Sequence, residues 1–574
     1  MFLDTVVEIP KATGKVTRLT KNGTTYVYFE YARVYDPVRK FNIPKRKVIG
    51  KQLSDDKGKM HPNENFQVYF PNAVLTEIHQ EVKRSCSIHA GAYIVLKSIM
   101  DKSGVSQMIR DILGRKDGGL FLDLALYTII CEDNAAQYFP DYAYNHPLFS
   151  EHMRIYSDSH ISSVLSSMRE EKSAEFLNRW NDQHKCKDRI YISYDSTNKN
   201  CAAGDIEMVE YGHPKVDAGL PVFNCSIAYD RTNRIPLFYE EYPGSVVDVS
   251  QLQYMLEKAK AYGYNKAGFI LDRGYFSKSN IQFMDENGFQ FVIMTKGMGR
   301  LTAELIQRRK GTFENIRKNY IRHHELYGTT IEGKLYADDQ KNRFFHLFYS
   351  SVRAAGEQRD LERLLNRMAA TMDKLIGKKV DLPEGYSKYY NLHYDKEQKL
   401  LFYREKEEEI EKLINLCGYF VIISSEKMSA TEALDLYKSR DDSEKLFRGD
   451  KSYLGSKSMR VQSDEAVSAK LFIEFVALIA RNKFYTNLSE AMKTMDKKPN
   501  YMTVPAAIKE LDKIELGRQH DGHYRLDHAV TATQKTILSA FGLDDEYIRQ
   551  KATEIGKQLY EADQDQYVRV EEEE

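Results

Sequence analysis

The sequence lacks the features of several protein classes. Its six cysteines form no C-x-x-C pair, which argues against a zinc site and against the disulfide framework of a secreted protein. The longest apolar stretch, residues 471–480, is interrupted by Glu474 and is far shorter than the roughly 18 to 20 residues of a membrane span. Asp4 and Glu8 stand where a signal peptide would be basic and then apolar. We therefore expect a cytoplasmic protein in a reducing compartment, with no membrane partner.

Two common enzyme motifs are also absent. No G-x-x-x-x-G-K-S/T phosphate loop and no G-x-S-x-G elbow occurs, which disfavours an ATPase and a serine hydrolase. Hydrophobic residues make up 42% and aromatic residues 12% of the chain, too much for a disordered, collagen-like or coiled-coil protein. At about 150 residues per domain, the length of 574 residues predicts three to four folded domains.

The charges are balanced in number but unevenly distributed. The 83 basic and 83 acidic residues sum to zero, yet residues 1–60 carry 13 Lys and Arg against 6 Asp and Glu, including Lys45, Arg46 and Lys47. Residues 561–574 carry seven acids and one arginine. The basic N-terminal segment could therefore contact DNA phosphates. The acidic tail either solubilises the chain or shields a basic surface.

The N-terminal half of the chain changes periodicity twice. In residues 1–72, two alternating Thr-, Val- and Tyr-rich runs flank Asn22-Gly23, which predicts a β-hairpin. Residues 73–185 show helical periodicity in pieces closed by Gly, Pro or polar clusters. From Arg189, three short β-type runs precede alternating helices and strands, an order that predicts a mixed sheet with helices packed against it.

The second half begins with an interruption of this pattern. Residues 297–417 contain a basic helix, a strand pair, a long charged helix and an irregular Tyr-rich stretch. The strand GYFVIISS then precedes a strongly helical segment with Ser429 or Thr431 as its N-cap. From residue 462 the pattern is helical. The whole pattern predicts a multidomain α/β protein.

Two aspartates are expected at the rim of the predicted sheet. Asp195 ends the strand in YISYD, and Asp272 holds the matching place in FILDRGY. If the two strands are neighbours, both carboxylates meet at one edge, where a cation or a proton must relieve their repulsion. Mg²⁺ is the economical cation, because it binds through a few carboxylates and substrate phosphates. For either motif alone, an ordinary turn or capping role is the alternative.

A charged helix carries a third acid. Offsets of three, four and seven place Tyr437, Arg440 and Glu444 on one helix face, and Lys451 follows seven residues after the glutamate. Glu444 could supply a third carboxylate, which Arg440 and Tyr437 could orient. Alternatively these two residues, together with Lys451, could meet DNA phosphates. The same pattern in isolation also fits a solvated helix face with an i,i+4 ion pair.

Together these motifs resemble those of a known family. The spacing Y-x2-R-x3-E-x6-K, met by Tyr437, Arg440, Glu444 and Lys451, resembles the signature of the DDE transposases of bacterial insertion sequences, specifically the YREK group. The YDST segment and the tetrad D-R-G-Y that begins at Asp272 are similar to that family's first two catalytic regions, in the same order. The resemblance covers roughly residues 155–485. It implies an RNase H-like mixed-sheet core with an insertion between the second and third acids.

The resemblance also implies roles for these residues. Asp195, Asp272 and Glu444 would be catalytic and would bind two Mg²⁺ ions, with Mn²⁺ as a substitute, for in-line displacement at phosphorus. Tyr437, Arg440 and Lys451 would position the transposon-end DNA. Arg273, directly after Asp272, is a further predicted DNA contact. Relatives that form a DNA hairpin stack a base on tryptophan, and the only tryptophan here, Trp180, lies upstream of the core. This position of the tryptophan argues against a hairpin route, in which a Tyr or Phe would have to take that role.

The predicted modules follow from the periodicity and the resemblance. They are an N-terminal β module for DNA contact (1–72), a helical end-binding or linker module (73–185), the first part of the core (186–296), an insertion with β structure (297–417), the second part of the core with the catalytic helix (418–461), and a helical C-terminal region with the acidic tail and a possible dimerisation role (462–574).

The predicted insertion begins with a basic run and a histidine pair. The run includes Arg308, Arg309 and Lys310, and either backbone-phosphate contacts or a solvated helix face would explain it. His323 and His324 are adjacent, and adjacent side chains on a helix diverge. Because no third ligand lies at a suitable spacing, this pair is not expected to bind a metal.

These features predict a DNA transposase that binds terminal inverted repeats, cleaves the ends of its element and joins them to target DNA. Its partners would be double-stranded DNA and, in the synaptic complex, a second copy of the chain; its location would be the cytoplasm of a bacterium, at the nucleoid. One alternative is a metal-dependent, structure-specific DNA nuclease, which leaves cut ends rather than a covalent joint. Another is a domesticated DNA-binding protein with a relic core.

Overall fold

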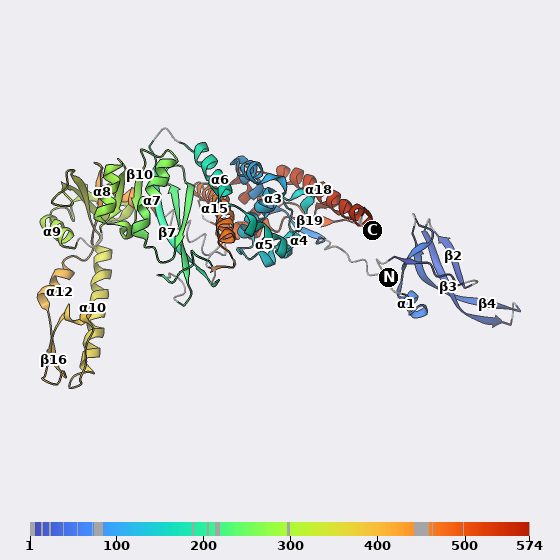
Figure 1. The fold of residues 1–574 in the computed structure, drawn as a ribbon, viewed down its shortest axis with the longest axis horizontal. Coiled ribbons are helices and arrows are strands. Elements are labelled where there is room, and N and C mark those ends of the chain that lie inside the picture. Colours follow the sequence, from blue (N-terminus) through green and yellow to red (C-terminus); the bar gives the residue numbers. More distant parts are fainter. Residues whose placement is uncertain are drawn as a thin grey trace. The chain divides into compact units, whose positions relative to one another are not determined.

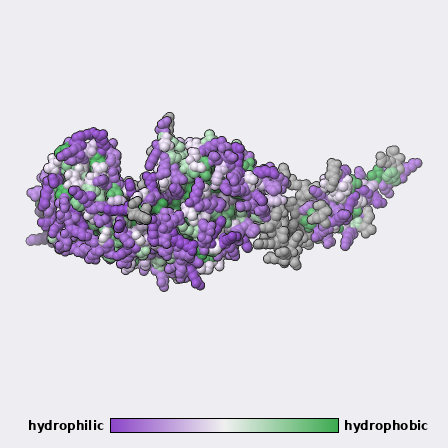
Figure 2. Space-filling view, turned by 90° about the horizontal axis from the view of Figure 1, so that it is seen from above, coloured by the Kyte–Doolittle hydropathy of each residue, from purple (hydrophilic) through white to green (hydrophobic). Residues whose placement is uncertain are grey.

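The described chain falls into two compact units, residues 1–84 and residues 85–574 (Figure 1). The computed structural model describes residues 6–12, 15–21, 24–37, 40–53, 56–71, 73, 84–185, 189–203, 206–212, 219–295, 299–440, 458–461, 463–496, 499–519 and 521–572. Hydrophilic side chains cover most of the visible face of the larger unit (Figure 2). Among the described helices, none combines the length and the apolarity needed to cross a membrane.

The smaller unit is a five-stranded antiparallel sheet with one helix. Its strand order is β1 (Val7–Glu8), β5 (Lys59–Pro62), β4 (Phe41–Gln52), β3 (Thr24–Asp36) and β2 (Val16–Lys21), and helix α1 spans Glu64–Tyr69. Strands β2 and β3 pair up to Lys21 and Thr24, which confirms the predicted hairpin pairing around Asn22-Gly23, two residues outside the described part. Val27, Ile49, Met60 and Phe66 form the apolar core.

A ten-stranded mixed sheet forms the centre of the larger unit. Its path runs through β12 (Tyr320–Ile321), β13 (Leu326–Gly333), β14 (Arg343–Tyr349), β17 (Tyr419–Ser424), β11 (Gln290–Met294), β10 (Gly268–Leu271), β7 (Tyr191–Cys201), β8 (Val222–Asp230) and β9 (Ile235–Pro243), and β18 (Ser458–Met459) also pairs with β7. Strands β7, β8 and β9 are antiparallel, whereas β10 runs parallel to both β7 and β11. Helices α7 (Asp248–Ala261) and α8 (Lys278–Glu286) connect these strands, as the alternating pattern predicted.

Helices surround a long buried helix beside the sheet. Helix α15 (Asp464–Lys493) packs against α2 (Gly91–Lys102), α3 (Val105–Ile130), α5 (Asp158–Ser167), α6 (Glu170–Gln183) and strand β9. Gly114 interrupts α3 with a left-handed φ of 80°. A glycine is suited to this conformation because it has no Cβ. Gly114 is thus a glycine that closes one helical piece, as the periodicity of residues 73–185 predicted, and a second piece of α3 follows it.

The region after residue 462 is not entirely helical. It contains η6 (Asn500–Met502), α16 (Val504–Leu511), α17 (Ala532–Ser539) and α18 (Asp545–Glu572), but also β19 (Glu515–Arg518) and β20 (Tyr524–Leu526). Strand β19 pairs with β6 (Ser87–His89), so the two ends of the larger unit share a small sheet. The remaining short elements before β7 are η1 (Ala136–Tyr138), α4 (Phe139–Asn145) and η2 (Glu151–Met153).

The interval 297–417 divides between the sheet and a separate small core. Helix α9 (Gly299–Arg309), η4 (Arg317–Asn319) and η5 (Arg322–His324) lie around β12 and β13, which with β14 extend the main sheet. Helices α10 (Ser351–Asp373), α11 (Glu384–Ser387) and α12 (Glu407–Ile414) project from the sheet with the hairpin of β15 (Tyr390–Tyr394) and β16 (Leu400–Glu405) (Figure 1). The Tyr-rich stretch expected to be irregular is this hairpin, because Tyr390 and Leu400 pack on Leu365 and Met372 of α10.

A buried histidine in the extension of the sheet predicts a pH-dependent stability. His346 of β14 is fully buried, and its ring nitrogens contact the hydroxyls of Thr330 and Ser424 at 2.9 Å each. Burial lowers the pKa of His346 to about 4. The folded protein therefore binds fewer protons than the unfolded chain between that pH and about 6.5, so acid in this window lowers the free energy of unfolding by up to about 3 kcal/mol.

The variant His346→Gln is expected to lose this part of the acid sensitivity, measured by urea unfolding between pH 7 and pH 4. His393→Gln, which changes an exposed imidazole stacked on Phe402, is the matched control and should keep the wild-type dependence. If the free energy of unfolding of His346→Gln fell with acid as much as that of the wild type, groups other than His346 would be the cause.

Candidate active site

The first predicted catalytic residue lies inside strand β7 of the sheet. Asp195 is the fifth residue of β7, which continues to Cys201, so the expectation that Asp195 ends the strand is wrong. The strand continues because Asp195 to Asn200 pair with β8. The Asp195 carboxylate is half-buried, and its Oδ1 accepts a hydrogen bond from the Ser196 amide at 2.9 Å.

The second aspartate lies beside the first on the neighbouring strand. Strands β7 and β10 pair in parallel up to Tyr194 and Leu271, and Asp195 and Asp272 directly follow this last pair. Residues at matching positions of adjacent parallel strands lie about 5 Å apart at Cα. The Asp272 carboxylate caps a short 3₁₀ turn, η3 (Arg273–Tyr275), by accepting from the Arg273 amide at 2.7 Å. The expectation that the two strands are neighbours is confirmed.

Helix α13 (Ala430–Lys438) crosses the sheet next to these aspartates. Ser429 begins the helix through a capping box with Glu432: the Ser429 hydroxyl accepts from the Glu432 amide, and the Ser429 amide donates to the Glu432 carboxylate. Leu434 and Tyr437 pack on a cluster with Val292 of β11 and Ile422 of β17. This apolar face fixes the helix on the sheet and places Tyr437 over the strand ends.

Two signature residues contact the second aspartate. The Tyr437 hydroxyl donates to Asp272 Oδ1 at 3.5 Å, and Arg440 Nη1 lies 3.1 Å from the same oxygen. The guanidinium carbon of Arg440 also lies 5.6 Å from the centre of the Tyr437 ring. The side chain of Arg440 is only 15% exposed and that of Asp272 36%, so this ion pair is partly shielded from water. The positive charge of Arg440 compensates the negative charge of Asp272.

The described part of the predicted charged helix reaches only as far as Arg440. Helix α13 ends at Lys438 with Ser439 as its C-cap, and Arg440 directly after the cap is again helical. The side chains of Tyr437 and Arg440 both reach Asp272. Glu444 and Lys451 lie outside the described residues.

A hollow opens beside Arg440. It has a volume of about 330 Å³. Three cationic side chains line it, those of Arg353, Lys438 and Arg440. Its other lining residues are Met294, His324, Leu326, Ser350, Phe420, Leu434 and Tyr437. The hollow thus combines positive charge with aromatic rings near Asp272, which are features that suit a nucleic acid.

The other predicted DNA contacts lie on exposed surfaces. Arg273 follows Asp272 directly and is exposed. On α9 and just after it, Arg308, Arg309 and Lys310 are exposed, and Lys310 Nζ donates to the Asn415 carbonyl at 3.1 Å. In the smaller unit, Lys45, Arg46 and Lys47 are exposed on β4, and Arg46 lies 3.6 Å from Glu30. Their DNA contacts remain predictions.

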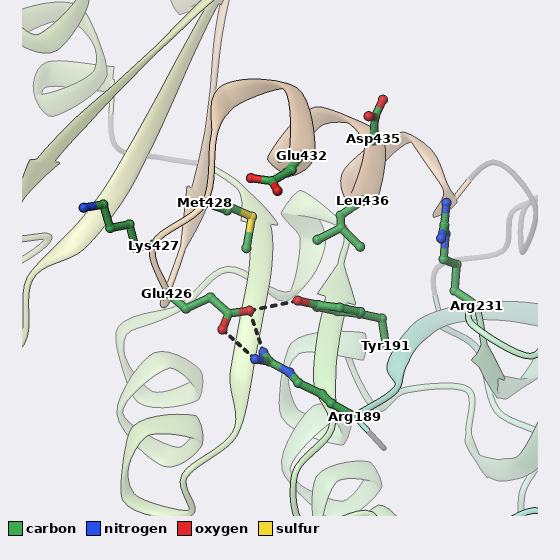
Figure 3. A pocket seen from close by; sticks show the side chains of 9 residues that line it. All are labelled: Arg189, Tyr191, Arg231, Glu426, Lys427, Met428, Glu432, Asp435 and Leu436. Atoms are coloured by element: carbon green, nitrogen blue, oxygen red, sulfur yellow. Dashed lines mark hydrogen bonds and ion pairs between the residues drawn. The ribbon is translucent and has the colours of Figure 1, made fainter. Parts of the chain in front are cut away.

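Sequence patterns did not predict a second hollow near the start of β7. Its volume is about 380 Å³, and Glu426 at one side holds Arg189 through two bonds of 2.5 and 2.6 Å and accepts from the Tyr191 hydroxyl at 2.9 Å (Figure 3). Burial and the Glu426 hydrogen bond raise the pKa of Tyr191 to about 12. Because more than 230 residues separate these partners, no local motif could signal the contact.

We compared the sequence and the fold of this chain with those of known proteins. No curated protein matches this sequence. One solved structure with similarity is a cryo-EM structure of the piggyBac transposase synaptic complex with hairpin DNA. It shares 9% identity over 70% of this chain, with a TM-score of 0.32, and the chain spans 65% of the length of that protein.

Residues 193–480 match the family model described as Transposase DDE domain. This match covers half of the chain and contains Asp195, Asp272, Tyr437 and Arg440. The chain therefore belongs to the family of transposases with a DDE domain.

Proposed function

We propose that this chain is a DNA transposase that binds the terminal inverted repeats of its element, cleaves the ends and transfers the strands into target DNA. The observation that carries this proposal is the placement of Asp195 and Asp272 side by side on β7 and β10, with Tyr437 and Arg440 held on Asp272. Membership of the DDE family supports the same chemistry.

An RNase H-like core is the proposed architecture around this site. The strand order β9, β8, β7, β10 and β11, with three antiparallel strands followed by two parallel ones, supports this proposal. The proposed modules keep the predicted limits 1–72, 73–185, 186–296, 297–417, 418–461 and 462–574, with the catalytic core divided by the insertion.

The donor atoms at the site suit a hard divalent cation. Two carboxylates on adjacent strands offer the oxygen ligands that Mg²⁺ prefers. We propose that Asp195, Asp272 and Glu444 hold two Mg²⁺ ions, with Mn²⁺ as a substitute. When bound, such ions stabilise both the attacking and the leaving oxygen of an in-line displacement at phosphorus.

Arg440 has two possible anionic partners in this proposal. Its guanidinium lies 3.1 Å from the Asp272 carboxylate and compensates its charge. A guanidinium binds a phosphate as well as a carboxylate, since its planar donors match both. Arg440 would therefore pass from Asp272 to a DNA phosphate when the site is loaded, and the Tyr437 ring beside it would keep its orientation. Lys451 would add a second phosphate contact.

The proposed partners are double-stranded DNA and a second copy of the chain. The exposed basic residues of β4 and α9 support phosphate contacts outside the active site. Two element ends must be brought together, so a homodimer is proposed for the synaptic complex. We place the protein at the nucleoid in the bacterial cytoplasm.

Product analysis tests this function. The purified chain is incubated with a duplex carrying one element end and with a target plasmid, in Mg²⁺ or in EDTA. A transposase gives cleaved ends and a covalent donor-target joint in Mg²⁺ and neither in EDTA. Cut ends without a joint would support the nuclease instead, and DNA binding without any cleavage in Mg²⁺ or Mn²⁺ would support a relic core.

The variant Arg440→Ala tests the proposal that Arg440 exchanges Asp272 for a DNA phosphate. Hydrogen bonds to charged groups contribute about 1.5 to 3 kcal/mol, so we expect end cleavage at saturating Mg²⁺ to fall about 10- to 100-fold. The Mg²⁺ concentration for half-maximal cleavage should not rise, because Asp272 loses a competing cation. Arg549→Ala, which removes an exposed arginine of α18, is the matched control. A raised Mg²⁺ requirement in Arg440→Ala would contradict this exchange of partners.

A further inference from the structure

Two adjacent histidines and one aspartate converge on the outer side of helix α13. The Nε2 atoms of His323 and His324 lie 2.7 and 2.8 Å from the same oxygen, Oδ1 of Asp435. One possible ligand atom from each of the three residues lies within 4.8 Å of the others. We call these three residues the His-His-Asp cluster. Asp435 also lines the hollow around Glu426, and in Figure 3 its carboxylate points away from Glu426.

The backbone explains why the two imidazoles converge. The expectation that these side chains diverge assumed an α-helix, but they lie in the turn of a hairpin, in the 3₁₀ segment η5. Glu325 closes this turn with a left-handed φ of 53°. The ring centres of His323 and His324 therefore lie only 4.2 Å apart, with an angle of 47° between the planes.

Apolar packing holds this turn against α13. Ile321 and Leu326 flank the turn and pair across strands β12 and β13. Both are buried in the same cluster as Leu434 and Tyr437 of α13. The histidines and Asp435 are thus brought together by two elements that are already fixed to each other, which limits the cost of assembling the cluster.

The donor set suits a transition metal. Two imidazole nitrogens and a carboxylate oxygen are a common protein ligand set for Zn²⁺ with one position left for water. Mg²⁺, which prefers oxygen ligands, is not suited to it. We propose that the His-His-Asp cluster binds one divalent transition-metal ion, such as Zn²⁺, separately from the proposed catalytic magnesium site.

The observed distances need only a small adjustment to accept the ion. Zn–N and Zn–O bonds of about 2.0 to 2.2 Å at tetrahedral angles separate neighbouring ligand atoms by about 3.3 to 3.6 Å. His323 is 56% exposed and Asp435 43% exposed, so both can rotate by this amount, whereas His324 is 15% exposed and held by its surroundings. The exposed side of the cluster leaves room for a water ligand.

The place of the cluster in the fold suggests what the ion does. Asp435 precedes Tyr437 by two residues and Arg440 by five, and His324 lines the same hollow as these two residues. An ion held here would join the β12–β13 turn to the helix that carries the contacts to Asp272. The proposed role is therefore structural: the metal locks α13 on the sheet.

Metal titration of the full-length chain, without a histidine tag and stripped of metal, tests this site. With Zn²⁺ in a chelator-competition titration, the wild type should bind one ion that Asp435→Asn binds far more weakly. Loss of a direct ligand should cost more than the roughly 10- to 100-fold that loss of a ligand's hydrogen-bond partner costs. Co²⁺ should give visible absorption bands of a nitrogen- and oxygen-ligated site in the wild type and not in Asp435→Asn.

The controls separate this site from other histidines and from the proposed function. His324→Ala should lose the same ion, whereas His393→Ala should retain it. Asp435→Asn keeps the shape of the side chain, and a wild-type circular dichroism spectrum would show that it folds. Asp272→Asn should retain the Zn²⁺ ion whatever its cleavage activity, so failure of the transposase proposal leaves this result unaffected. Equal Zn²⁺ affinity of the wild type and Asp435→Asn would overturn the inference.

Discussion

Replacing Asp272 by asparagine is expected to abolish Mg²⁺-dependent cleavage of a duplex that carries an element end. Asparagine has the same shape but no charge, so it can keep the contacts to the Arg273 amide and Tyr437 while it loses most of its affinity for a divalent cation. Removal of one group that stabilises transition-state charge typically costs about 100- to 1,000-fold in rate, and a shared metal ligand should cost at least as much. Single-turnover cleavage on denaturing gels measures the loss.

The same loss is expected for Asp195→Asn and for Glu444→Gln, while binding of the end duplex persists in all three variants. Asp360→Asn, which changes an exposed aspartate on α10, is the matched control and should cleave at the wild-type rate. Because β7 and β10 place Asp195 and Asp272 at matching positions, these two variants should fail together. Strand cleavage retained by any one of the three variants would remove that residue from the catalytic set.

The sequence predicted the strands and helices around this site because their apolar periodicity is strong. The runs that form β7 to β11 and β17, and the helix that begins at Ser429, appear where the pattern placed them. The predicted end of β7 at Asp195 failed for a physical reason. The segment STNKNC is polar and has the composition of a turn, but in the fold its side chains are buried and the strand pairs on both sides.

Contacts between distant parts of the chain were less predictable. The offset of three between Tyr437 and Arg440 was enough to bring both to Asp272, even though α13 ends between them. By contrast, the convergence of His323 and His324 depends on the turn at Glu325, whose left-handed backbone no sequence pattern indicated. The pairing of β6 with β19 joins residues more than 400 positions apart, and neither strand is long enough to show its own period.

A buried ion pair lies behind the active site, and breaking it is expected to cause a large loss of folding stability. Lys199 of β7 and Glu474 of α15 are 2% and 3% exposed, and their Nζ and Oε2 atoms lie 2.5 Å apart. Glu474 Oε1 also accepts from the Asn134 side chain at 3.0 Å. Lys199 lies four residues after Asp195, hence on the same face of the strand. This pair therefore ties the strand that carries the first catalytic residue to the central helix.

The variant Glu474→Gln is expected to lower the free energy of unfolding by about 3 to 5 kcal/mol at pH 7, because it leaves the Lys199 charge buried without its anion. Lys470, one helical turn away, is also buried, and burial lowers its pKa to about 8. Because a lysine is never an anion, it cannot replace the lost carboxylate. The free energy of unfolding of the wild type should itself increase as the pH rises above 8, because the pKa of Lys470 is lowered in the folded protein. A lysine whose pKa is lowered in the folded state binds fewer protons there than in the unfolded chain, so stability increases with pH in that range. Urea unfolding at pH 7 and pH 9.5 measures both effects.

A double variant separates loss of charge balance from loss of packing. Lys199→Met combined with Glu474→Gln removes both charges and keeps an acceptor for Asn134, so it should be more stable than Glu474→Gln alone. Lys535→Met breaks an exposed pair with Asp545 and should cost no more than about 1 kcal/mol. If Glu474→Gln cost as little as this surface control, the buried pair would not be what fixes β7 to α15. If the double variant regained stability, end cleavage should return with it, because neither residue is itself one of the proposed metal ligands.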